Sequence, residues 1–210
     1  MIINSNVGVL VKEGYGYIAL SFIPLAFSTL LDLPTILTLI FLALFVFNIY
    51  FFRNPERQIN NQGDESVLAP VDGKITAIER GEEYLVVTIE NSFKEPHIVR
   101  SAIVGKMTSI DQKHGLFNSF SQLESSLNER VVLIQNHIGQ SIKYELFYAH
   151  FPVRAIIYAN ENSNYNLGER LGFLSSGKIN LHLPLNLDIQ SNIGDSVLAG
   201  ESLIGFVKDV

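Results

Sequence analysis

Two adjacent hydroxyls followed by a glycine, Ser175, Ser176 and Gly177, are the residues of this chain best suited to nucleophilic chemistry. Small polar residues before a glycine are common in turns, and a simple turn is one interpretation of this stretch. The alternative is that one serine attacks the carbonyl carbon of the preceding residue and converts an amide into an ester. Elimination from that ester would cut the chain and leave a pyruvoyl group.

The serine pair stands at the start of a predicted strand. The side chains that follow alternate between apolar and polar, as in a half-buried strand: Ile179, Leu181 and Leu183 against Lys178, Asn180 and His182. Similar short runs, separated by glycines and prolines, fill the chain after Arg53. We expect strands at residues 66–69, 74–79, 84–90, 97–101, 105–110, 130–137, 141–151, 153–158, 170–174, 178–183, 196–198 and 202–207. The longest helix expected in this part covers residues 120–127.

Two glycine-turn stretches near the ends of this β-rich part, APVDGKI from Ala69 and IGDSVLAGESLIGFV from Ile193, are typical of paired strands at the ends of a carrier-type domain. They predict a mainly β, barrel-sandwich-like domain whose first and last strands share one core. We expect Leu203 and Phe206 to be buried in that core. A carrier or adaptor function is not favoured, because the chain lacks the Met-Lys-Met turn that is modified in such domains.

Composition divides the chain into two parts. Of its 210 residues 47% are hydrophobic and 17% are charged, and Asp32 is the only charged residue between Glu13 and Arg53. The absence of cysteine excludes disulfides, thiolate metal sites and a cysteine nucleophile. A net charge of −6, without any basic run that carries aromatic residues, argues against nucleic acid as a partner.

Residues 14–52 are too long for one transmembrane helix, because a helix of that length would span roughly 57 Å and a hydrocarbon core is about 30 Å thick. Asp32 and Pro34 predict a break, which leaves one helical arm at residues 15–31 and another at 35–52. The arms could cross the membrane twice, form a re-entrant hairpin, or pack as a buried hairpin in a soluble protein. Lys12 on one flank and Arg53 and Arg57 on the other predict that both ends are cytoplasmic. The expected organisation is a cytoplasmic segment at 1–13, a membrane helical hairpin at 14–52 and the β-rich domain at 53–210.

Several collinear stretches together resemble one family. They are FFRNPER at 51–57, APVDGKI at 69–75, PHIVRSAIVGKM at 96–107, HGLFNSF at 114–120, LNER at 127–130, GERLGFL at 168–174, INLHLP at 179–184 and GDSVLAG at 194–200. The order and content of these stretches resemble the short bacterial and archaeal form of phosphatidylserine decarboxylase. The chain departs from the family pattern at one place. The family has Gly-Ser before its VDLYLP-like strand, whereas this chain has Ser175-Ser176-Gly177 and is one residue shorter there.

The resemblance implies roles for particular residues. The pyruvoyl cofactor would come from an internal serine, Ser176 or its neighbour Ser175, and no metal is implied. Asp72 and His97 would activate that serine, and His97 would protonate the carbon that loses CO₂. Asn128, Glu129 and Arg130 would bind or support the head group of the substrate. These residues also have ordinary structural interpretations: a hairpin turn for Asp72, a satisfied core histidine for His97, and a solvated helix end for residues 128–130.

The implied function is pyruvoyl-dependent decarboxylation of phosphatidylserine, or of archaetidylserine, at the cytoplasmic face of the cell membrane. The partners would be the phospholipid, the membrane, the second chain produced by self-cleavage and a possible second copy of the protein. The alternative is a related protein that does not cleave itself and instead binds lipid or a partner protein. His114, His137, His150 and His182 are too scattered to indicate a metal site.

Overall fold

The structure is a computed structural model of the chain, and it describes residues 8–59, 63, 65–115, 127–137, 139–148 and 155–207. The chain divides into two compact units, one ending at Glu56 and the other beginning at Arg57. Apart from Leu127, the helix expected at residues 120–127 lies outside the described residues.

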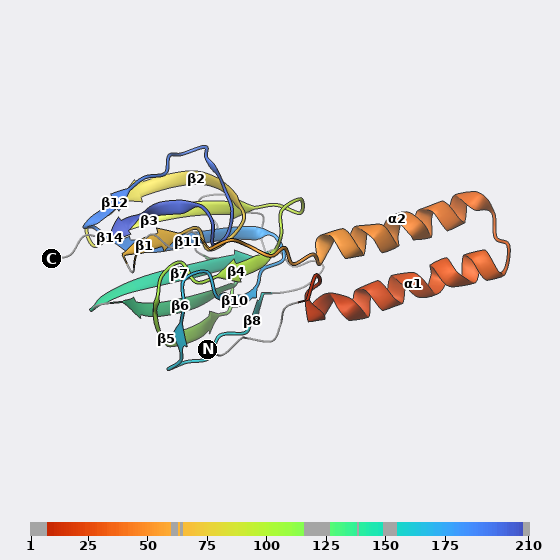
Figure 1. The fold of residues 1–210 in the computed structure, drawn as a ribbon, viewed down its shortest axis with the longest axis horizontal. Coiled ribbons are helices and arrows are strands. Elements are labelled where there is room, and N and C mark those ends of the chain that lie inside the picture. Colours follow the sequence, from red (N-terminus) through yellow and green to blue (C-terminus); the bar gives the residue numbers. More distant parts are fainter. Residues whose placement is uncertain are drawn as a thin grey trace. The chain divides into compact units, whose positions relative to one another are not determined.

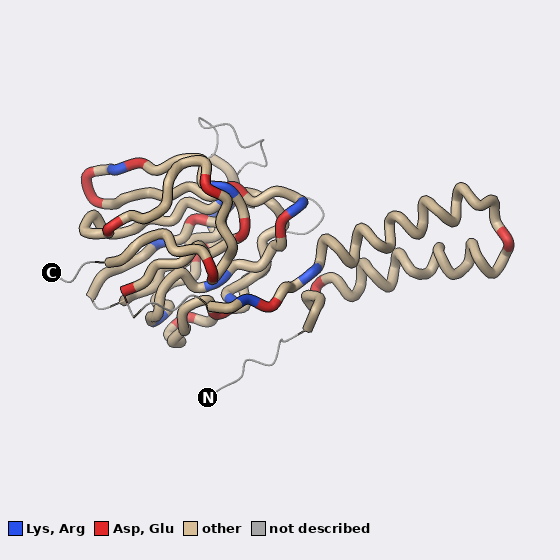
Figure 2. The backbone as a smooth tube through the Cα atoms, turned by 45° about the horizontal axis from the view of Figure 1, so that its top comes forward, with Lys and Arg blue, Asp and Glu red and all other residues tan. Residues whose placement is uncertain are grey.

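The first unit is a helical hairpin formed by α1 (Tyr15–Leu30) and α2 (Thr35–Phe51), and the turn η1 (Lys12–Gly14) precedes it (Figure 1). The chain reverses direction at Asp32, which has a left-handed φ of 46° and carries the charge at the tip of the hairpin (Figure 2). The two helices and the break between them lie within one residue of the ranges predicted from the sequence.

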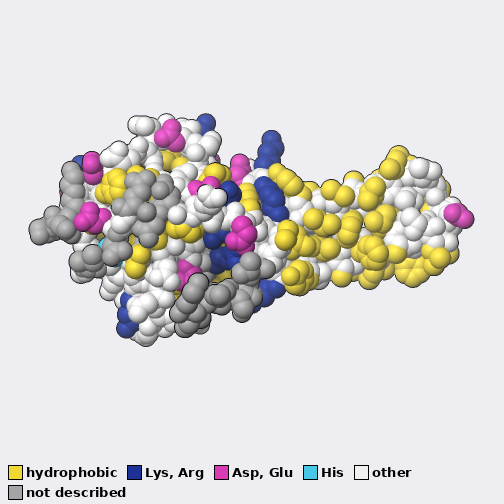
Figure 3. All heavy atoms as spheres, in the orientation of Figure 1, with side chains coloured by type: hydrophobic (Ala, Val, Ile, Leu, Met, Phe, Trp, Pro, Cys, Tyr) yellow, Lys and Arg dark blue, Asp and Glu magenta, His cyan; other side chains and the backbone are white. Residues whose placement is uncertain are grey.

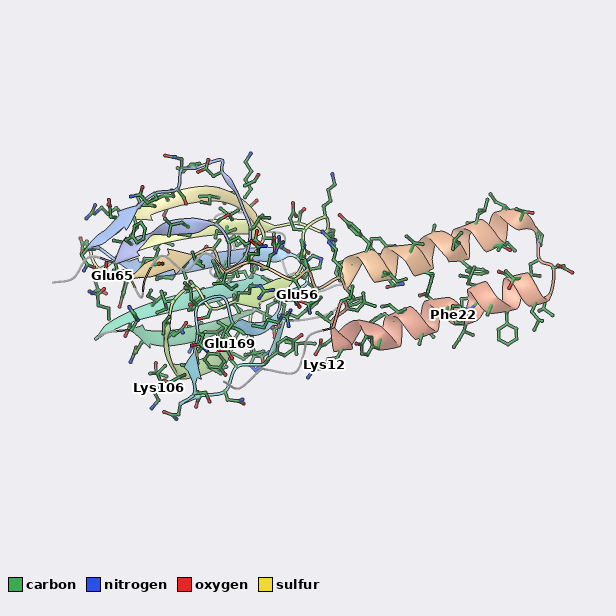
Figure 4. All side chains as sticks on the ribbon, in the orientation of Figure 1. Lys12, Phe22, Glu56, Glu65, Lys106 and Glu169 are labelled. Atoms are coloured by element: carbon green, nitrogen blue, oxygen red, sulfur yellow. The ribbon has the colours of Figure 1, made fainter. Side chains whose placement is uncertain are left out.

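Hydrogen bonds tie the two ends of the hairpin together. The amide of Val11 donates to the carbonyl of Phe52 at 3.0 Å, and the amide of Asn54 donates to the carbonyl of Val9 at 2.8 Å. The side chain of Asn54 also donates to the carbonyl of Gly8 at 2.7 Å. The chain therefore enters and leaves the hairpin at the same end, where Lys12 is labelled in Figure 4.

Small residues allow the two helices to pack closely, while their outer surfaces remain apolar. Ser21 and Ser28 are almost fully buried, and the ring centroids of Phe22 and Phe45 lie 5.6 Å apart. Apolar side chains cover much of the hairpin surface that Figure 3 shows. The exposed apolar residues of the two helices include Leu20, Ile23, Phe27, Leu30, Ile36, Leu39, Ile40, Val46 and Phe47. Within the described part of the chain, no helix is both long and apolar enough to cross a membrane.

The second unit is an antiparallel β domain built from three sheets (Figure 1). The largest sheet contains, in spatial order, β13 (Ser196–Val197), β2 (Gly73–Arg80), β3 (Tyr84–Asn91), β11 (Gly177–Pro184), β7 (Gln140–Tyr148), β6 (Arg130–His137), β5 (Gly105–Lys113) and β9 (Asn164–Tyr165). One smaller sheet contains, in spatial order, β1 (Ser66–Leu68), β14 (Leu203–Val207) and β12 (Leu187–Ile189). The other contains β4 (Ile98–Arg100), β10 (Arg170–Phe173) and β8 (Ile156–Ile157). The large sheet curls, which confirms the predicted fold class.

Alternate residues of the central strands point into one hydrophobic core. The core residues of β3, β11 and β7 are Leu85, Val87, Ile89, Ile179, Leu181, Leu183, Ile142, Tyr144, Leu146 and Tyr148. The hydroxyl of the buried Tyr144 donates to the Gln135 side chain at 2.8 Å and accepts from the amide of Ala102 at 3.0 Å. Burial raises the pKa of the Tyr144 hydroxyl, which therefore stays protonated as a donor.

The first and last strands of the domain meet in this core, as the glycine-turn stretches predicted. Strand β1 pairs with β14, and the amide of Ala69 donates to the carbonyl of Ser202 at 2.9 Å. The expected burial of Leu203 and Phe206 is wrong, because both side chains are partly exposed. Ile204 is fully buried instead, because the buried positions along β14 are shifted by one residue from the predicted ones. Strands β9 and β12 had no counterpart in the prediction.

Candidate active site

The register of the large sheet brings the predicted site residues to one of its ends. Gly177, the first residue of β11, lies opposite Asn91 at the end of β3 and opposite Tyr148 at the end of β7. Arg130, the first residue of β6, pairs with Phe147, which precedes Tyr148. The serine turn before β11 and the polar segment before β6 therefore lie at the same end of the sheet.

The serine turn is buried and conformationally strained. Ser175 is fully buried and Ser176 is 6% exposed. Ser176 has a left-handed φ of 41°, which costs a residue with a side chain about 1 to 3 kcal/mol. A β-carbon on Gly177 would lie 2.1 Å from the carbonyl oxygen of Phe147, so this position has no room for a side chain. A hydroxyl can therefore be accommodated at residue 176 but not at residue 177.

His97 contacts the backbone of this turn. It is fully buried, and its ring lies edge-on to Phe173 with centroids 5.7 Å apart. Its Nδ1 atom is 2.9 Å from Oδ1 of Asn91 and 3.4 Å from the backbone nitrogen of Ser176. That nitrogen belongs to the Ser175–Ser176 peptide bond, which is the bond that an attack by Ser176 would break.

Asn91 connects His97 to Asp72. The Asn91 Nδ2 atom donates to the backbone carbonyl of Asp72 at 2.7 Å and to that of Pro96 at 2.9 Å. The Asp72 carboxylate is almost completely buried and lies 2.5 Å from Nη2 of Arg57. The Arg57 guanidinium thus places a positive charge beside the buried carboxylate.

Asn128 and Glu129, the two residues before β6, belong to a second polar group at this end of the sheet. Asn128 and Glu129 are both buried, so they are not a solvated helix end. A carboxylate oxygen of Glu129 accepts a hydrogen bond from Gln112 at 2.8 Å and lies 3.8 Å from Nδ1 of His114. The Gln112 amide also lies 3.4 Å from the hydroxyl of Tyr148. Glu129 therefore contacts two side chains at the end of β5, Gln112 and His114.

Two cations flank one aromatic ring beside the serine turn. Phe147 pairs with Lys178 on β11 and with Arg130 on β6, so the three side chains lie on one face of the sheet. The Arg130 guanidinium carbon is 5.5 Å, and the Lys178 Nζ atom 5.7 Å, from the centre of the Phe147 ring. Lys178 is only 8% exposed, and no carboxylate of a described residue forms an ion pair with it.

Glu145 lies two residues before Phe147 on β7, on the same face of the large sheet, and is the centre of an ion-pair network. Its carboxylate lies 2.8 Å from Nζ of Lys143 and 3.2 Å from Nε2 of His182. Burial alone would raise the pKa of Glu145, but the hydrogen bonds and charges of His182 and Lys143 outweigh it and lower the pKa to about 2. Glu145 is therefore ionised and paired, and we assign it a structural role. Among the described residues, which do not include His150, no three His, Asp or Glu side chains are placed to hold a metal ion.

The structure brings most of the predicted site residues together. His97 contacts Ser176 directly and Asp72 through Asn91, and Arg130 begins the strand at the same end of the sheet. Arg100 lies in the same sequence stretch as His97, and its side chain donates a hydrogen bond to the backbone carbonyl of Gly168 at 2.9 Å.

Three residues of this region are not predicted as site residues from the sequence. Asn91 follows a predicted strand and has the signal of an ordinary turn residue. Arg57 lies in the FFRNPER stretch, where its charge indicates only a flank of the hairpin. Lys178 alternates with apolar residues, which indicates the polar side of a half-buried strand. The signal available for Lys178 was its position two residues after Ser176.

Comparison with known proteins places the chain in a family. The family model for phosphatidylserine decarboxylase matches residues 44–205. Curated relatives include the phosphatidylserine decarboxylase proenzyme of Ehrlichia ruminantium, which is 32% identical over 94% of this chain and 91% of the relative. The proenzyme of Syntrophotalea carbinolica is 32% identical over 93% of this chain and 95% of the relative. The proenzyme of Desulfotalea psychrophila is 29% identical over 92% and 94%, respectively. No solved structure gives a significant match.

Proposed function

Because the chain belongs to the phosphatidylserine decarboxylase family, we propose that it removes the carboxylate of a serine phospholipid as CO₂, using a pyruvoyl group made from Ser176. The observation that best supports this proposal is the 3.4 Å contact between His97 Nδ1 and the nitrogen of the peptide bond to be cut. The strained backbone of Ser176 and the lack of space at Gly177 point to the same residue. Phosphatidylserine and archaetidylserine share the serine head group that this site would recognise.

Self-cleavage at Ser176 follows a balanced sequence of steps. Its Oγ atom loses a proton and bonds to the carbonyl carbon of Ser175, while the carbon–nitrogen bond between the two serines breaks and the nitrogen gains a proton. Loss of the Cα proton of Ser176 then expels the Ser175 carboxylate. Addition of water releases ammonia and leaves a pyruvoyl group on residue 176. His97 is positioned to exchange a proton at the nitrogen, and the Asp72–Arg57 pair supports the same end of the sheet.

The same residues suit the decarboxylation that follows. A pyruvoyl group at residue 176 would supply an electron sink for the electron pair that is released as CO₂ leaves. His97 would hold the proton that replaces the lost carboxylate. Lys178 would hold the phosphate of the head group, because it is a buried amine beside an aromatic ring and forms no ion pair with a carboxylate of the described residues. Arg130, which lies 3.9 Å from the Glu145 carboxylate, flanks the same ring from the other side. Glu129 and Asn128 would support this arrangement from the end of the neighbouring strand.

The helical hairpin would attach the protein to the cytoplasmic face of the cell membrane, where the substrate resides. Its outer surface is apolar on both helices, and the hydroxyls of Ser21, Ser28 and Thr29 donate to backbone carbonyls of their own helix at 2.8 to 2.9 Å. These hydroxyls therefore need no water. Tyr15, Tyr17 and Tyr50 lie near the open end together with Lys12 and Arg53, as expected where a helix meets lipid head groups. Labelling of cysteines placed at residues 5 and 62 from the same, cytoplasmic, side would support this arrangement, and labelling from opposite sides would contradict it.

A second candidate function is favoured by one observation, the replacement of Gly-Ser by Ser176-Gly177. A protein that folds but does not cut itself would bind the lipid or a partner protein without catalysis. The mass of the purified chain distinguishes the two functions. Cleavage before Ser176 gives a fragment of residues 176–210 that begins with pyruvoyl, whereas the non-cleaving protein stays at 23.5 kDa.

Serine variants locate the cut. Ser176→Ala should abolish both cleavage and CO₂ release from a serine phospholipid, because the attacking oxygen is lost. Ser175→Ala is the matched control and should still be cut, since it changes only the residue before the bond. If the two variants exchange behaviour and the small fragment gains one residue, Ser175 is the nucleophile.

A further inference from the structure

We propose that Asn91 is a positioning residue that fixes His97 as the Nδ1–H tautomer, and this inference rests on the role given to His97 in the proposed function. Asn91 is the last residue of β3 and is 5% exposed. Its side chain makes three contacts: one with His97 and two with backbone carbonyls. These contacts are enough to define which amide atom faces which partner.

The two carbonyls set the orientation of the Asn91 amide. The oxygens of Asp72 and Pro96 can only accept hydrogen bonds, so the group that faces both of them at 2.7 and 2.9 Å must be the NH₂ donor. The opposite orientation would place the amide oxygen against two other oxygens in a buried site. Oδ1 therefore faces His97.

The amide oxygen in turn sets the proton on the imidazole. Oδ1 of Asn91 accepts only, and it lies 2.9 Å from Nδ1 of His97, so Nδ1 must carry the hydrogen. The competing arrangement, in which Nδ1 accepts from the Ser176 amide, spans 3.4 Å and would leave two acceptors in contact at 2.9 Å. In the neutral ring the lone pair then belongs to Nε2.

This tautomer has a chemical consequence for the cut. Nδ1 lies 3.4 Å from the Ser176 nitrogen, and that nitrogen must gain a proton when the bond to Ser175 breaks. Nε2 is then the basic nitrogen of the neutral ring. Because the same amide also holds the backbone of Asp72, Asn91 fixes His97 and Asp72 in one geometry. In Asn91→Asp, one carboxylate oxygen would still accept the hydrogen bond from Nδ1 of His97. The other oxygen would face the backbone carbonyl oxygens of Asp72 and Pro96, which also carry negative partial charge.

Nitrogen NMR tests the tautomer without requiring activity. The probe is the full chain in detergent micelles, labelled with [¹⁵N]histidine and carrying Ser176→Ala so that it stays uncut. The His97 signals are identified by their loss in His97→Gln. We expect a protonated Nδ1 and an unprotonated Nε2, retention of this pattern in Asn91→Asp, and its loss in Asn91→Ala. A merely structural role for Asn91 predicts the same tautomer in both variants. A protonated Nε2 in the Asn91 parent would overturn the proposal even if the alanine variant does not fold.

Processing kinetics provide the second readout. In the chain with Ser176 intact, Asn91→Ala should slow self-cleavage roughly 10²-fold, the usual scale of a lost acid–base contribution. The matched control is Asn180→Ala, which removes a side-chain amide from the neighbouring β11, where its oxygen accepts a hydrogen bond from Thr88 at 3.1 Å. It should change neither the tautomer nor the cleavage rate. If the parent chain never cuts but shows the expected tautomer, the proposed function fails and the role of Asn91 in fixing the ring stands. If the chain cuts with the other tautomer, only the role of Asn91 is lost.

Discussion

Gly177 lies so close to Phe147 that a β-carbon on residue 177 would be 2.1 Å from the Phe147 carbonyl oxygen. The two residues sit on adjacent strands, β11 and β7, where the backbone cannot retreat without breaking the pairing of Gly177 with Tyr148. In this chain, the hydroxyl available for self-cleavage is therefore the one before the glycine. The order of the two residues is fixed by space in the sheet.

Reversing that order tests the steric constraint. The double variant Ser176→Gly, Gly177→Ser recreates the Gly-Ser order of the family resemblance, and we expect it to remain uncut and to melt at a lower temperature, because the new side chain strikes the Phe147 carbonyl. Ser176→Gly alone is the control, since it removes the hydroxyl without adding a side chain at 177. Efficient cleavage after residue 176 in the double variant would show that the strand rearranges to admit the serine.

Removal of Arg57 should destabilise the β domain. Asp72 is buried and its carboxylate lies 2.5 Å from the Arg57 guanidinium, so Arg57→Met leaves a buried charge without its partner. The expected loss is about 3 kcal/mol of unfolding free energy, measured by denaturant titration. Asp72→Asn in the same chain should recover part of it. Lys106→Met, at an exposed position of β5, is the control and should change little; equal losses in the two single variants would argue against the pair.

Acid should weaken the protein through Glu145. Its pKa is lowered from 4.5 to about 2 in the folded state, so its contribution to stability is fully present above about pH 4.5 and is lost as the pH falls toward 2. The contribution is about 2 kcal/mol after allowance for solvent screening. Glu145→Gln should flatten the dependence of unfolding free energy on pH within that window. Glu82→Gln, at an exposed position between β2 and β3, should keep it, and an unchanged slope in Glu145→Gln would show that other carboxylates carry the effect.

The last strand offers a matched pair of core variants. Ile204 is fully buried, and Ile204→Ala should cost about 2 to 5 kcal/mol of unfolding free energy because it leaves a cavity. Its neighbour Leu203 is partly exposed, so Leu203→Ala should cost clearly less. Both values can be read from the same denaturant series. A larger loss of unfolding free energy for Leu203→Ala would show that Leu203, and not Ile204, points into the core.

Lys178 should affect substrate affinity more than turnover. It is buried beside Phe147 without a carboxylate partner among the described residues, and a substrate phosphate would supply one. Lys178→Gln should raise KM for a serine phospholipid about tenfold, the scale of one charge-assisted contact, while kcat changes little. Lys74→Gln, at an exposed position of β2, is the control. A fall in kcat without a change in KM would assign Lys178 to the chemistry or to processing.

The elements of the fold could be predicted because their signals are local. The helical hairpin follows from two apolar runs separated by Asp32 and Pro34, and the long strands follow from alternation of apolar and polar residues. The short strands β9 and β12 are too brief to show alternation, and their partners are distant in the sequence. The phase of β14 could not be read, because a single glycine at 205 interrupts the alternation.

The site was predicted only in part, for a related reason. Ser176, His97 and Asp72 have side chains that chemistry requires, so residue type and the family resemblance identify them. Asn91 acts through hydrogen bonds to residues that become its neighbours only when β3 and the turn before β4 have formed. Nothing in the residue types around Asn91 distinguishes such a link from an ordinary turn.

The central position of β11 gives self-cleavage a thermodynamic consequence. This strand is bonded to β3 on one side and to β7 on the other, and the segment after Ser175 also supplies β12, β13 and β14. A cut before Ser176 would therefore turn one folding chain into a two-chain assembly held together by a shared sheet. Refolding of the cut protein from denaturant would become bimolecular and dependent on protein concentration, whereas the uncut Ser176→Ala chain would refold at a rate independent of concentration.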